Sequence, residues 1–107
     1  MSEYKDYIMN AFQIAVDTLE DVSAKDFNAA DKKFYFSFKT LRSMLDNATE
    51  INKIADLRGI VSKSLAMCKA MLAQSDKLSK STETTLLVSG ISDIMGNVAK
   101  ALKAMKE

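Results

Sequence analysis

The sequence predicts an all-α fold, an antiparallel up-down four-helix bundle that forms a single domain over residues 1–107. Apolar residues recur at the three- and four-residue spacing of one helix face in four stretches, which short polar segments separate. Proline is absent and glycine occurs three times, so neither hairpin turns nor flexible linkers are indicated. Because short loops make consecutive helices run antiparallel, the four stretches predict a bundle.

The stretch over residues 82–106 has the widest apolar face and is expected to organise the core. Asp93 is the only charged residue between Glu83 and Lys100. A helix with so little charge needs a large apolar surface to pack against. Ser81 is its expected N-cap. The apolar stripe consists of Leu87, Ile91, Ile94, Val98, Leu102 and Met105, widened by Val88, Met95 and Ala99.

Two further helices are predicted in the first half of the chain. The first covers about residues 3–23, with Ser2 as its N-cap. Its stripe consists of Tyr4, Ile8, Ala11, Phe12, Ala15, Leu19 and Val22. The second covers about residues 28–45, and Asp26 or Asn28 is expected to cap it. Its buried face consists of Phe27, Ala30, Phe34, Phe38, Leu41 and Leu45.

Phe36 does not fit the buried face of the second helix. On a helical wheel it lies opposite that face, with Lys32 and Lys39 about one turn away on either side. Two interpretations remain open at this point. Phe36 contacts a neighbouring helix, or it is an aromatic residue that faces a partner molecule.

The third predicted helix covers about residues 48–78, and Asn47 with Glu50 resembles a capping box at its start. Its main apolar face consists of Ile51, Ile54, Leu57, Val61, Leu65, Cys68 and Leu72. A second apolar row beside that face consists of Ile60, Met67, Met71 and Leu78. Gly59 costs about 1 kcal/mol relative to alanine inside a helix, so a break there would give five helices.

The predicted lengths of the second and third helices differ strongly. At ~1.5 Å per residue they would span about 27 Å and about 45 Å. The longer helix would leave apolar surface uncovered, and contiguous apolar patches are uncommon on soluble monomers. The sequence therefore predicts a homodimer through Ile60, Met67, Met71 and Leu78, unless Gly59 breaks the third helix.

The absence of histidine excludes most of the chemistry that helical bundles perform. Phosphotransfer on histidine, di-iron sites with Glu-x-x-His pairs and haem ligation by histidine all need a residue that the chain lacks. Cys68 has no histidine to activate it and is expected to be a buried structural thiol. No phosphate-binding loop, zinc pattern or dinucleotide motif occurs. The sequence predicts no enzyme, no cofactor and no metal site.

Composition indicates a cytoplasmic protein with an uneven charge distribution. A single cysteine suits a reducing compartment, and the N-terminus lacks the features of a signal peptide. No apolar run approaches the ~20 residues that span a bilayer. Residues 1–31 carry seven acidic residues and two lysines, whereas residues 32–80 carry ten Lys or Arg and four acidic residues.

These features favour a non-enzymatic protein-binding module that occludes or holds a protein partner. Its size and class are those of bacterial immunity proteins, phage-encoded inhibitors and secretion chaperones. The residues expected to bind partners are Phe36, Lys32, Lys39, Ile60, Met67, Met71 and Leu78.

Two other functions compete with protein binding. A nucleic-acid-binding regulator would use Phe36 with Lys32, Lys33, Lys39 and Arg42, although the chain has only two arginines for bidentate contacts. Association with a membrane surface would use the lysines at positions 100, 103 and 106 beside the last apolar stripe. That stripe is needed for the core, so membrane binding is the weakest of the three.

Overall fold

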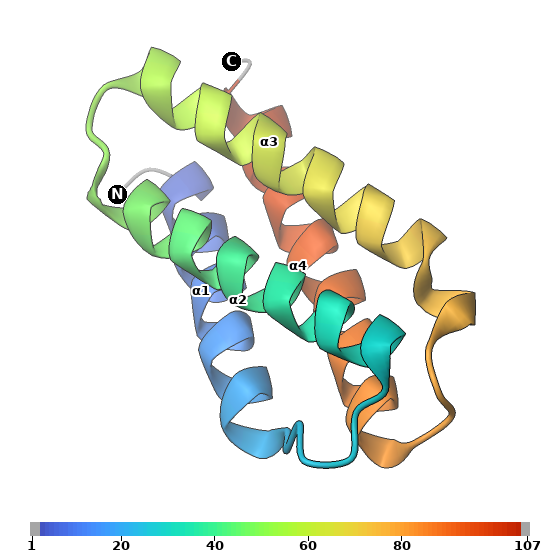
Figure 1. Ribbon diagram of the computed structural model, residues 1–107. Helices are drawn as coiled ribbons and strands as arrows, with labels where there is room; N and C mark the ends of the chain where they lie inside the picture. Colours follow the sequence, from blue (N-terminus) through green and yellow to red (C-terminus); the bar gives the residue numbers. More distant parts are fainter. Residues whose placement is uncertain (1–2, 106–107) are drawn as a thin grey trace.

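The computed structural model describes residues 3–105, and over these residues four α-helices form an antiparallel bundle (Figure 1). The helices are α1 (Glu3–Asp21), α2 (Ala29–Glu50), α3 (Ile54–Ala73) and α4 (Thr82–Met105), and a short 3-10 turn, η1 (Ser75–Lys77), follows α3. Each helix packs against the next one in the chain, and α4 also packs along α1, which closes the bundle. The predicted four-helix bundle is confirmed.

The connections between helices lie at the two ends of the bundle. Figure 1 shows the α2–α3 connection at the same end as the start of α1 and the end of α4. The α1–α2 connection and the segment from η1 to α4 lie at the opposite end. The first half of α2 and the second half of α3 therefore meet near that opposite end.

The helices are nearly equal in length, which the sequence did not predict. They contain 19, 22, 20 and 24 residues in chain order. Helix α2 continues to Glu50 because Ala48 extends its buried stripe beyond Asp46 and Asn47. Asn47 and Glu50 therefore lie in the last turn of α2, and the capping box expected there for α3 is wrong.

Helix α3 is shorter than predicted at both ends. It begins at Ile54, after an extended Ile51, and it ends at Ala73. Gly59 lies inside α3 and does not break it, so the five-helix alternative is wrong. The prediction of a third helix much longer than the second is also wrong. Because the homodimer was expected to cover that excess length, the reason for expecting it no longer holds.

Side-chain caps begin α2 and α4. Asn28 Oδ1 accepts a hydrogen bond from the Asp31 amide at 2.9 Å, while Asp31 Oδ2 accepts one from the Asn28 amide at 3.2 Å. Ser81 Oγ accepts a hydrogen bond from the Thr84 amide at 3.1 Å. Asn28 and Ser81 are therefore confirmed as caps. Ser2, expected to cap the first helix, lies outside the described residues.

Asp31 connects the start of α2 to the segment that follows η1. Its carboxylate is completely buried, and it accepts hydrogen bonds from the Ser79 amide at 2.9 Å and from Ser79 Oγ at 2.5 Å. Burial alone would raise the pKa of this carboxyl, but the hydrogen bonds from Ser79 and Asn28 outweigh burial and lower the pKa below its ordinary 3.8. Asp31 is therefore an ionised cross-link between two segments.

The core follows the predicted apolar stripes. The central residues of the α4 stripe, Leu87, Ile91, Ile94 and Val98, are completely buried. Ala99 and Ile54 are exceptions, because both were predicted on apolar faces and both side chains are exposed. Cys68 is buried, and burial raises the pKa of its thiol to about 11. The expectation that this thiol is buried is confirmed.

Gly90 allows α4 to approach its neighbours closely. A Cβ atom built at this position would lie 2.8 Å from Thr18 Oγ1 and 3.3 Å from Phe38 Cζ, whereas one built at Gly59 or Gly96 would meet nothing within 4 Å. We expect Gly90→Ala to lower the free energy of unfolding by about 1–2 kcal/mol, because overpacking outweighs the gain in helix propensity. Chemical denaturation measures the change.

The two other glycines provide matched controls for this substitution. Gly59→Ala and Gly96→Ala should each stabilise the domain by up to about 1 kcal/mol, because both positions are helical and open. A Gly90→Ala protein as stable as these controls would contradict the close packing of α1, α2 and α4 at Gly90.

Candidate partner-binding groove

An open apolar groove lies between the first half of α2 and the second half of α3. Its volume is about 430 Å³. The buried side chains of Phe34, Met71 and Leu78 line it together with the half-buried Met67. Lys33 on α2 and Lys77 in η1 also line it, and both are exposed. The groove therefore combines an apolar lining with two cationic side chains at the surface.

Small residues on both helices create the hollow. Ala30 and Ser37 on α2 and Ala70 on α3 line the groove. Their helical positions face the crevice between α2 and α3, where longer side chains would fill the space. Methionine is flexible and polarisable, so Met67 and Met71 can adjust to different apolar side chains placed between them.

The Asp31–Ser79 connection holds one wall of the groove. Leu78 and Lys77 line the groove immediately before Ser79, which donates two hydrogen bonds to Asp31. Because Asp31 belongs to the first turn of α2, its carboxylate fixes the η1 segment against that helix. The hydrogen bonds thereby hold this wall in position within the chain.

The structure brings together three of the four residues predicted for a dimer face. Met67, Met71 and Leu78 line the groove, but Met71 and Leu78 are only 5% and 9% exposed. Ile60 lies two turns before Met67 on α3, in a separate depression with Met44. The four residues therefore do not line one hollow, and the homodimer expected through them stays a prediction.

Phe36 is exposed on the outer surface of α2. Its side chain is 67% exposed, so the interpretation that it contacts a neighbouring helix is wrong. Lys32 and Lys39 are exposed beside it, and the ammonium group of Lys39 lies 4.8 Å from the centre of the Tyr35 ring. Lys33, three residues before Phe36, belongs to the groove. Phe36 therefore lies outside the groove lining, about one helical turn after the groove residue Lys33.

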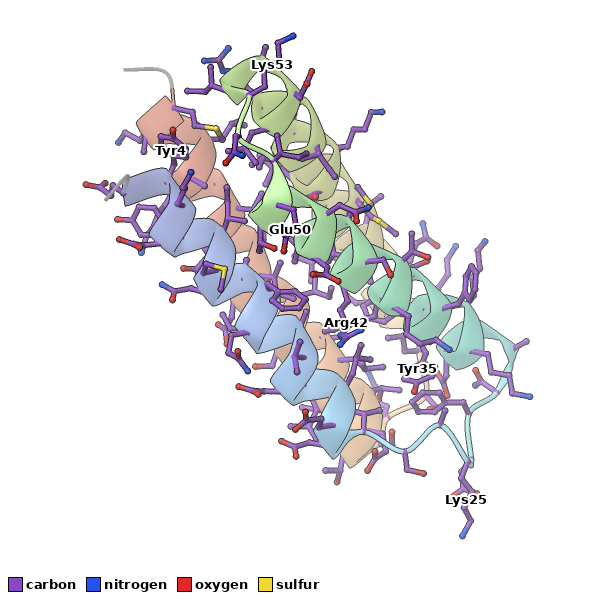
Figure 2. All side chains as sticks on the ribbon, turned by 90° about the vertical axis from the view of Figure 1, so that its left-hand side faces the viewer. Tyr4, Lys25, Tyr35, Arg42, Glu50 and Lys53 are labelled. Atoms are coloured by element: carbon purple, nitrogen blue, oxygen red, sulfur yellow. The ribbon has the colours of Figure 1, made fainter. Side chains whose placement is uncertain are left out.

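Arg42 does not contribute to an open basic surface. Figure 2 shows its side chain between α1 and α2, and its guanidinium carbon lies 5.8 Å from the centre of the Phe12 ring. The side chain is half-buried. The exposed basic residues of the predicted α2 face are therefore lysines 32, 33 and 39.

Sequence reasoning missed the residues that shape the groove. Ala30, Ser37 and Ala70 carry no chemistry of their own, and their role depends on which helix lies opposite. Lys77 was placed in a long third helix, whereas it belongs to η1. The sequence carries no direct signal for this role, because it does not show which residues of α2 lie opposite the methionine row of α3.

Other kinds of site receive no support from residues 3–105. No group of three or more His, Cys, Asp or Glu residues in this range is placed to hold a metal ion. None of the helices described there has the length and apolar character needed to cross a bilayer.

Comparison of the chain with protein-family models, with curated proteins and with solved structures found no match.

Proposed function

We propose that this protein is a non-enzymatic binding module of the cytoplasm that holds or occludes a protein partner in the α2–α3 groove. One observation carries the proposal, namely an open apolar groove of about 430 Å³ with a 67% exposed phenylalanine on the adjoining surface. Grooves of this kind receive the apolar face of a partner helix in many complexes. Aromatic residues, phenylalanine among them, are enriched at protein interfaces relative to the rest of the surface.

The side chains available for catalysis support a binding role. Cys68 is the chain's single thiol, and its burial and raised pKa disfavour nucleophilic attack. The buried carboxylate of Asp31 is occupied by hydrogen bonds from Ser79 and Asn28. The groove itself contributes methionine, phenylalanine, leucine and lysine, which suit adhesion to a protein surface.

A different protein is favoured over a second copy of this chain as the occupant. The dimer was predicted to cover a third helix that outruns its neighbours, and α3 is shorter than α2. Met71 and Leu78 are already buried within the chain. The apolar surface that remains exposed is a concave groove. Its shape is complementary to a convex surface on another protein.

Nucleic-acid binding remains the second candidate because of Phe36. An exposed aromatic ring among lysines can stack on a base while the lysines contact phosphates. Arg42 packs over Phe12, and the remaining basic residues of this face are lysines. Lysine lacks the bidentate geometry with which arginine recognises phosphates and bases. Protein binding therefore ranks first.

A pair of lysine substitutions on α3 tests the proposed function. Met67→Lys places a charge in the groove, and Ala66→Lys places one on the exposed side of the same turn. We expect immobilised wild type to retain a specific protein from an extract of its source cells. Met67→Lys should reduce that retention about tenfold or more, while Ala66→Lys leaves it unchanged. Native mass spectrometry identifies what is retained.

Three other results of the retention experiment would lead to different conclusions about the function. Equal retention by Met67→Lys and wild type would refute binding in the groove. Retained nucleic acid that is lost with Lys32→Glu and Lys39→Glu would favour the second candidate. A wild-type mass of twice 11.8 kDa that reverts to 11.8 kDa in Met67→Lys would make a second copy the occupant.

A further inference from the structure

We infer that the groove binds an acidic amphipathic α-helix of the partner, an inference that rests on the proposed function and specifies its target. Three features of the α2–α3 surface support it. These are the spacing of two depressions along the helix pair, the sign of the charges beside them, and the fixed position of the η1 wall.

A second hollow lies further along the α2–α3 crevice, separate from the groove. This open depression, of about 560 Å³, is lined by Met44 on α2 and Ile60 on α3. Met44 is seven residues after the groove residue Ser37, and Ile60 is seven residues before Met67. Because seven residues make two helical turns, both steps place these residues on the same face, about 10 Å from the groove.

A docked helix matches this spacing. Apolar residues at positions i and i+7 of a helix also lie about 10 Å apart on one face. One such residue would enter the groove between Met67 and Phe34, and the other would enter the depression at Ile60. A compact small molecule would occupy one hollow only, so the pair of hollows favours an elongated helical occupant.

The charges around the two hollows are predominantly positive. Lys33 and Lys77 are the ionisable residues that line the groove. Lys63, one turn before Met67 on α3, lines the depression, and Asp56 is the acidic residue that also lines it. Asp76, next to Lys77 in sequence, lines a different hollow with Lys80 and Thr84. Carboxylates flanking the apolar stripe of the partner helix would therefore meet lysines.

The wall formed by η1 makes the groove selective for shape. Leu78 is held through Ser79 by the buried carboxylate of Asp31, so this wall does not have to be ordered during binding. A preformed site loses less conformational entropy when the ligand binds. The lysines add electrostatic steering, which weakens as salt screens exposed charges.

Two synthetic peptides test the charge of the partner. Both carry leucines at the i, i+3, i+4 and i+7 positions of one face, and their other positions are rich in glutamate in one peptide and in lysine in the other. We expect fluorescence anisotropy with wild type at about 0.05 M salt to give a dissociation constant about tenfold lower for the glutamate peptide. Raising the salt to about 0.15 M should bring the dissociation constants of the two peptides closer together.

Charge reversal in the groove provides the decisive comparison. In the double variant Lys33→Glu with Lys77→Glu, the preference should change to the lysine peptide. The matched control is Lys69→Glu with Lys103→Glu, which alters net charge equally at exposed positions outside both hollows. The control should keep the preference of wild type, because neither of its lysines lines a hollow where a docked peptide would contact it.

The remaining outcomes overturn the inference or the proposed function separately. A lysine peptide that binds wild type as well as the glutamate peptide would refute the acidic partner, and so would a control that loses the preference. If neither peptide binds while Met67→Lys still loses the retained protein, the groove binds proteins but the acidic helix is wrong. If Met67→Lys also leaves retention unchanged, the proposed function itself fails.

Discussion

Ile94→Asp is expected to unfold the domain. Ile94 is completely buried in the middle of α4, the helix that packs along both α1 and α3. An aspartate there would place a carboxylate among apolar side chains, and a buried charge without a partner costs several kcal/mol. A domain of this size has a total stability of about 5–15 kcal/mol, so the loss is a large fraction of the whole. Circular dichroism and thermal denaturation measure it.

Ser92→Asp provides the control for this substitution. Ser92 lies on the exposed side of the same helix, two residues before Ile94. Its replacement introduces the same side chain without burying it, so stability should change by about 0.5 kcal/mol or less. An Ile94→Asp protein with the helicity and melting temperature of the control would show that α4 is not the centre of the core.

Asp31→Asn is expected to destabilise the domain by about 2–3 kcal/mol at neutral pH. The carboxylate accepts hydrogen bonds from the amides of Asn28 and Ser79 and from Ser79 Oγ. An asparagine amide can replace one acceptor oxygen, but its NH₂ group then faces donors in a buried site. Losing hydrogen bonds to a charged group and leaving donors without acceptors each cost about 1–3 kcal/mol. Urea denaturation measures the change.

The effect of Asp31→Asn should depend on pH in a defined direction. The folded state lowers the pKa of Asp31 below 3.8, so the ionised carboxylate stabilises the fold at all pH values above the unfolded pKa. This contribution is lost as pH falls from about 4 through the lower folded pKa. The difference in stability between wild type and Asp31→Asn should therefore be constant near neutral pH and shrink below about pH 4.

An exposed carboxylate on the same helix provides the comparison. Asp46→Asn alters an exposed residue near the end of α2, and we expect a change of about 0.5 kcal/mol or less. A difference between Asp31→Asn and wild type that stays the same from pH 7 to about pH 2.5 would contradict an ionised Asp31 in the fold. Because Asp31 also holds the η1 wall, its loss should weaken peptide binding in the groove as well.

Local sequence patterns determined the helices, two of their caps and most of the core. The α4 stripe from Leu87 to Val98 is buried as its three- and four-residue spacing requires. Asn28 and Ser81 cap the helices that follow them, because the interactions that start a helix lie within about four residues. The exposure of Phe36 also agrees with its position opposite the stripe, although the sequence left two interpretations open.

Tertiary packing alone decided where α2 ends and where α3 begins. Asp46 and Asn47 interrupt the apolar pattern, yet Ala48 is buried against neighbouring helices, so the chain stays helical to Glu50. The sequence does not show where α2 ends, because the free energy gained by burying a small side chain such as Ala48 depends on which residues of other helices pack against it. The error in this boundary produced the overlong third helix and the dimer expected from it.

The groove likewise exists only through the pairing of α2 with α3. Met67, Met71 and Leu78 were identified from the sequence as an apolar row, but the hollow among them depends on Ala30 and Ser37 on the opposite helix. A helical sequence shows which residues share a face, and it does not show which face of another helix meets them or how large the facing side chains are. The sequence by itself therefore determined the apolar residues of the site, and packing between helices determined its shape.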